Sequence, residues 1–137
     1  MKAWHAAVAR FHAAIEAAYP PGFFDAFQRI RSGDRGAVDP VLSFLEADPY
    51  FSRSGCVKAS LIRAVKKVTF TSAQRERAQR IVLAVIDSGD RPRFRSYCQL
   101  ARVIDGPLLR AGLTARLTSE DNGVRRRAGW VLAALHP

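Results

Sequence analysis

An internal repeat of 42 residues constrains the fold of this chain more than any other feature of its sequence. The segment 53–62 matches the segment 95–104 at five positions, and Asp48 recurs as Asp90 at the same offset. A third, weaker copy lies 31 residues further on, within 121–135. A period near 40 residues is typical of stacked two-helix units, in which each unit buries its apolar face against its neighbours.

Apolar residues recur at helical spacing along the chain, and residues that break or cap helices separate these segments. Val57, Leu61 and Val65, for example, fall four residues apart, which places them on one helical face. No window alternates with a period of two, so we expect no sheet. Short links between the segments favour antiparallel hairpins. We expect helices to begin at Asp39-Pro40, Asp48-Pro49, Thr71 or Ser72, Asp90 and Asp121-Asn122-Gly123, and a break at Asp105-Gly106-Pro107.

The third copy of the repeat carries the most specific pattern. Its spacing is Asp121-x-x-Val124-Arg125-x-x-Ala128-x-x-x-Leu132-x-x-Leu135. This pattern resembles the second helix of HEAT repeats, in which Asp caps the helix and Arg pairs with the turn Asp of a neighbouring repeat. In the earlier copies the Arg follows the Asp by five residues instead of four, so those repeats are irregular.

The resemblance implies an all-α, HEAT-like α-solenoid of about four antiparallel helical hairpins, as opposed to a plain helical bundle. It covers roughly residues 40–135. We therefore predict a single helical-repeat domain over residues 1–137, with an N-terminal capping hairpin at 1–36 and repeats at 39–136.

The composition adds an excess of positive charge and excludes several classes of protein. The chain has 22 Lys and Arg against 12 Asp and Glu, for a net charge of +10, and 18 of the cations are Arg. Its 48% hydrophobic content excludes a disordered polyelectrolyte. Charged residues interrupt the apolar N-terminal segment, which argues against a signal peptide. We predict a cytoplasmic protein without a membrane partner, whose Cys56 and Cys98 are thiols.

Basic residues lie along equivalent helices of successive repeats. Helical spacing places Arg91, Arg95 and Arg102 on one side of one helix, and Arg63 occupies the matching side one repeat earlier. Stacked helices would align these stripes into a basic surface, although charged helix faces are also commonly just solvated. The candidate contacts to phosphate or to an acidic partner are Arg53, Arg63, Arg91, Arg95, Arg102, Arg125, Arg126 and Arg127.

One aromatic residue is a candidate for stacking on a base. Trp130 lies off the apolar face of its predicted helix, so we expect it to be partly exposed.

The sequence offers little for catalysis or metal binding. His12 and Glu16 are four residues apart, but no third ligand is evident. No Gly-rich phosphate loop and no Ser/His/Asp cluster is present. HEAT-like repeats also form the alkylpurine DNA glycosylases, but no residue pattern here matches that family. We predict a non-enzymatic protein without metal, cofactor or small-molecule substrate.

Two functions remain open from the sequence. The first is a binding module whose basic face contacts the backbone of DNA or RNA. The second is an adaptor that docks an acidic protein, since repeat proteins serve both kinds of partner.

Overall fold

The computed structural model describes residues 22–49 and 54–136, and every regular element in these ranges is helical. The all-α prediction is therefore confirmed for this part of the chain. A short 3₁₀ turn at Arg35–Ala37 joins the first two helices. The helices are α2 (Phe23–Arg31), α3 (Val38–Ala47), α4 (Ser54–Val65), α5 (Ser72–Asp87), α6 (Phe94–Ile104), α7 (Pro107–Arg116) and α8 (Asn122–Leu135).

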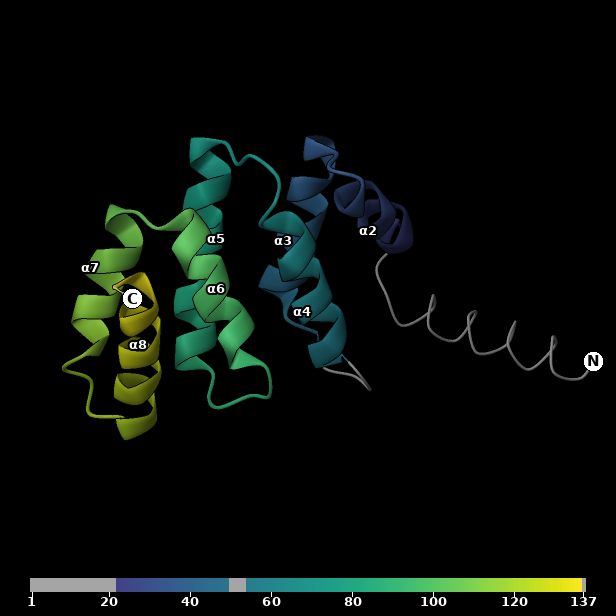
Figure 1. Ribbon diagram of the computed structural model, residues 1–137. Coiled ribbons are helices and arrows are strands. Elements are labelled where there is room, and N and C mark those ends of the chain that lie inside the picture. The colour runs from purple at the N-terminus through teal and green to yellow at the C-terminus, as the bar shows by residue number, and fades with distance from the viewer. Residues whose placement is uncertain (1–21, 50–53, 137) are drawn as a thin grey trace, which may run out of the picture.

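The helices form two layers (Figure 1). Successive helices pair as the hairpins α3–α4, α5–α6 and α7–α8. Across the hairpins, α3, α5 and α7 lie side by side in one layer, and α4, α6 and α8 lie side by side in the other. Helix α2 packs on both α3 and α4 at the N-terminal end. The first helix predicted for the capping hairpin lies outside the described residues.

A continuous apolar core runs between the two layers. Each hairpin contributes fully buried side chains, for example Leu42, Leu61, Ile86, Leu100 and Leu113. Truncation of such a residue to Ala costs about 2–5 kcal/mol. The core therefore fixes the order of the helices and the relative positions of their outer faces. Within the described ranges, no helix combines the length and apolarity that a membrane span needs.

Local signals position several helix ends as predicted. The Thr71 hydroxyl accepts a hydrogen bond from the Gln74 backbone, and the Gln74 side chain accepts one from the Thr71 backbone, which completes a capping box. Asp121 caps α8 by accepting from two backbone N–H groups. Pro107 occupies the first turn of α7 after an extended Gly106.

Three predicted helix starts differ from the structure, and the carboxylates of Asp39, Asp48 and Asp90 bond to side chains elsewhere in the fold. Helix α3 begins at Val38, ahead of the predicted Asp39-Pro40 start. Asp90 lies in the loop before α6, which begins at Phe94. Asp48 ends α3 in a left-handed conformation, with φ of 47°. Instead of capping the next helix, Asp48 and Asp90 bond to cationic side chains from other helices.

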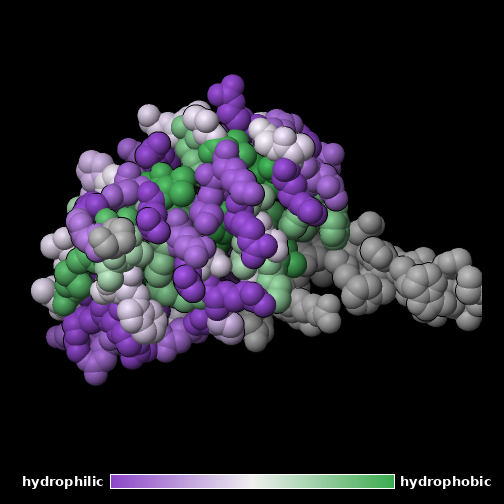
Figure 2. Space-filling model, viewed as in Figure 1, coloured by the Kyte–Doolittle hydropathy of each residue, from purple (hydrophilic) through white to green (hydrophobic). Residues whose placement is uncertain are grey.

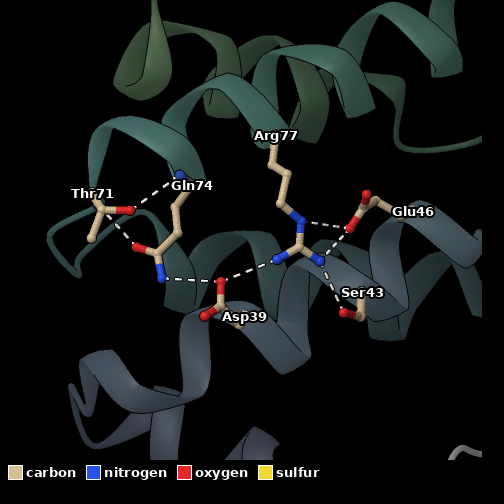
Figure 3. Close-up of polar contacts among 6 residues, drawn as sticks. All are labelled: Asp39, Ser43, Glu46, Thr71, Gln74 and Arg77. Carbon is tan, nitrogen blue, oxygen red and sulfur yellow. Dashed lines mark hydrogen bonds and ion pairs between the residues drawn. The ribbon is translucent and has the colours of Figure 1, made fainter.

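A cluster of polar side chains joins α3 to α5 on the outer surface (Figure 3). The Arg77 guanidinium donates to Asp39 at 3.0 Å and also bonds to Glu46. Gln74 donates to the same Asp39 carboxylate at 3.2 Å. Both carboxylates of α3 therefore bind Arg77, a cation of their own layer.

Candidate functional site

The two layers differ in the charges that their helices carry. The layer of α4, α6 and α8 contains no Asp or Glu within its helices, whereas α3 and α5 both contain carboxylates. The helices of this layer carry seven cationic residues: Lys58, Arg63, Arg95, Arg102, Arg125, Arg126 and Arg127. Among the described helices, those of the α4, α6 and α8 layer therefore carry the larger net positive charge.

One part of this charge holds the first two hairpins together. The two terminal guanidinium nitrogens of Arg91, Nη1 and Nη2, donate to the two oxygens of the Asp48 carboxylate at 2.8 Å each. The buried Lys58 ammonium donates to the same carboxylate at 2.6 Å. The hydrogen bonds from Arg91 lower the pKa of Asp48 to about 2, with a smaller contribution from Lys58 and against the opposing effect of burial. Arg91 therefore has a structural role between hairpins.

The next two hairpins are joined by the same kind of contact. Arg127 is only 4% exposed and donates to the Ile86 carbonyl at 2.7 Å and to Asp90 at 2.6 Å. Arg126 donates to the other oxygen of Asp90 at 2.8 Å. Hydrogen bonds from Arg127 and Arg126 lower the pKa of Asp90. Asp48 and Asp90, related by the 42-residue repeat, thus each bind an arginine of the following hairpin.

Three of the predicted contact residues are exposed cations on adjacent helices. Arg63 lies on α4, and Arg95 and Arg102 lie on α6. Within the described ranges, none of the three forms an ion pair or hydrogen bond. We call these three residues the basic ridge. Figure 2 shows hydrophilic side chains over much of the face viewed.

The remaining predicted contact residues differ in their exposure and in the partners of their guanidinium groups. Arg125 is half-buried, and its guanidinium donates to the Ser119 carbonyl, so its charge has no carboxylate partner there. Arg126 is exposed but is paired with Asp90. Arg53 lies outside the described residues.

An aromatic platform lies on α8, beyond the ridge. Trp130 is 48% exposed, and its ring lies 5.8 Å from that of Phe94 by centroid distance. The Arg126 guanidinium lies 5.4 Å from the Trp130 centroid. The partial exposure predicted for Trp130 is confirmed. An indole fixed in this way can stack on another planar group at low entropic cost.

No family model, curated protein or solved structure matches the chain. In the described residues, no group of three His, Cys, Asp or Glu side chains could hold a metal ion. Cys56 is exposed, whereas Cys98 is buried and burial raises its thiol pKa.

Two further cations lie near the ridge. Lys67 is exposed in the turn that follows α4, and it lines the same depression as Arg63. Arg31, at the end of α2, comes close to α4 through the packing of α2 onto it. The spacing of four residues from Arg63 can find Lys67, but no local signal in the sequence brings Arg31 to this surface.

Proposed function

We propose that this chain is a non-catalytic helical-repeat module that binds the phosphate backbone of a nucleic acid through the basic ridge. The observation that carries the proposal is the set of three unpaired arginines on two adjacent helices that contain no carboxylate. The +10 net charge of the chain favours the same class of partner.

The chemistry of the ridge suits phosphate groups. Each guanidinium presents a planar fork of donors that matches two oxygens of one phosphate, and it stays charged at all physiological pH values. Packed helices lie about 8–10 Å apart, a distance of the same order as the separation of neighbouring phosphates along one strand. Arg63 on α4 and Arg95 on α6 can therefore contact different phosphates of one backbone.

We also propose that the stack is a HEAT-like solenoid. Its support is the alternation of contacts, in which each helix packs on the helix two positions along the chain. The bonds from Arg91 to Asp48 and from Arg127 to Asp90 add support, because they join adjacent hairpins at the turn carboxylates of the repeat. The ridge then lies on the second helices of two successive hairpins, although the 42-residue offset does not relate its arginines to one another, since it pairs Arg63 with Asp105.

Salt-dependent binding of oligonucleotides tests the proposal. We would measure the affinity of single-stranded and duplex DNA and RNA at several salt concentrations for the wild type and for the double variant Arg95→Ala/Arg102→Ala. The logarithm of the binding constant falls linearly with the logarithm of the salt concentration. Loss of two phosphate contacts should reduce the magnitude of this slope by about 1.5–2. The matched control is Arg75→Ala/Arg80→Ala, which removes two exposed arginines from α5 in the other layer.

The outcomes separate the two functions left open by the sequence. Equal losses in both double variants would show non-specific attraction and would refute the ridge as the binding surface. If the wild type binds no nucleic acid, the proposal fails. Retention of one defined acidic protein after nuclease treatment, together with its loss in Arg95→Ala/Arg102→Ala, would then establish the adaptor function.

A further inference from the structure

A depression of about 590 Å³ lies between α2 and α4, at one end of the basic ridge. Its lining includes the Phe27 ring, the Ser60 hydroxyl and three cationic side chains. These cations are Arg31, Arg63 and Lys67. We call this depression the basic pocket. Its volume falls within the range of pockets that hold small ligands.

The described residues that line the basic pocket carry positive charge without a carboxylate among them. The nearby Asp34 accepts a hydrogen bond from Arg29 at 2.8 Å, so its carboxylate is already engaged. Within the described ranges, neither Arg63 nor Lys67 has a polar or ionic partner. Three positive charges thus converge on one concave site.

Two features make the pocket more than a patch of surface charge. The Arg31 guanidinium lies 5.6 Å from the centroid of the Phe27 ring, which restricts its position through a cation–π contact. The Ser60 hydroxyl, one turn before Arg63, adds a neutral donor to the lining. The pocket therefore combines cations with a donor from a rigid helix.

We propose that the basic pocket binds a phosphate monoester. A monoester carries about −1.5 to −2 charges at neutral pH and three terminal oxygens, whereas a backbone diester carries only one charge. Three converging cations match the monoester better. Arg63 belongs to both the ridge and the pocket, so a strand lying on the ridge reaches the pocket with its terminal phosphate. This source of the monoester rests on the proposed function, and a free nucleotide is the other source.

Matched oligonucleotides test the pocket. Wild-type protein would be titrated with three forms of one 12-nucleotide single strand, which carry a 5′-phosphate, a 3′-phosphate or hydroxyls at both ends. A separate titration would use adenosine monophosphate. We expect about tenfold tighter binding with one terminal phosphate than with hydroxyl ends, since a charge-assisted hydrogen bond contributes about that factor. The variant Arg31→Ala/Lys67→Ala should lose this preference and bind the hydroxyl strand within about twofold of wild type.

The ridge variant Arg95→Ala/Arg102→Ala is the matched control, because it too removes two exposed positive charges. This variant should bind every strand more weakly than wild type, and it should still prefer the strands with a terminal phosphate. Thermal unfolding followed by circular dichroism verifies that both variants fold. We expect both to fold, because all four substituted side chains are exposed.

Each result has a defined meaning. Binding of all strands without a terminal preference overturns the pocket inference and leaves the proposed function standing. If no strand binds but adenosine monophosphate does, and Arg31→Ala/Lys67→Ala abolishes that binding, the pocket holds a free nucleotide and the proposed function fails. Preference for a terminal phosphate that persists in Arg31→Ala/Lys67→Ala overturns the assignment to this pocket.

Discussion

Replacement of Asp48 by Asn tests the contact between the first two described hairpins. Asn has nearly the same shape and also tolerates the left-handed backbone of this position, where φ is 47°. The change removes the negative charge that binds Arg91 and Lys58, and it replaces one of the two acceptor oxygens with an NH2 donor. Any loss of stability therefore reports the contact with these two cations instead of backbone strain or a cavity.

The magnitude follows from the pKa of Asp48. Its value is lowered from 3.8 to about 2 in the folded chain, and each pKa unit corresponds to about 1.4 kcal/mol. The ionised carboxylate thus stabilises the folded state by about 2 kcal/mol at neutral pH. Because the folded pKa is lowered, this stability is present above pH 3.8. It is lost as the pH falls through about 2, and about half remains at pH 3.

Urea denaturation followed by circular dichroism provides the assay. The free energy of unfolding of Asp48→Asn should be about 2 kcal/mol below wild type at pH 7 and about 1 kcal/mol below it at pH 3. Asp121→Asn is the control, because Asp121 caps α8 and pairs with no cation in the described ranges. A difference for Asp48→Asn that stays constant between pH 7 and pH 3 would refute the ionic explanation.

Other substitutions test the packing and the thiols. Gln79→Met should cost about 2–4 kcal/mol in urea denaturation, because the buried amide bonds both a carbonyl and an N–H group of the α6–α7 turn; an unchanged midpoint would contradict this. Gly129→Ala should raise the unfolding free energy by about 0.5–1 kcal/mol, since a Cβ there meets nothing within 4 Å. Gly112→Ala should lower it by about 1–3 kcal/mol, since a Cβ there lies 2.5 Å from a buried side chain; equal effects of the two changes would argue against the packing described. Cys56 should react with a thiol reagent in the native protein and Cys98 only on unfolding, and two fast-reacting thiols would refute this.

Local chemistry made part of the fold predictable from sequence. The capping box at Thr71, the proline in the first turn of α7 and the cap at Asp121 depend on residues within a few positions of each helix end. The all-helical character likewise follows from the spacing of apolar residues. Such signals do not require knowledge of which helices meet.

The errors concern residues whose partners lie far away in sequence. Asp48 and Asp90 have the composition of helix starts, but Arg91 and Arg127 bind them from more than 35 residues away. The same contacts divide the predicted basic surface into cations that join hairpins and cations that face solvent. Helical spacing treats both kinds alike, because spacing gives the side of a helix and not the partner of a side chain.

The absence of carboxylates from α4, α6 and α8 also affects how the molecule approaches a partner. Charge concentrated on one layer gives the protein an electric dipole moment directed across the stack. A polyanion exerts a torque on this dipole over about one Debye length, about 10 Å at 0.1 M salt. For a polyanionic partner of the kind proposed, this dipole would favour encounters in which the ridge faces the partner, and low salt would accelerate association.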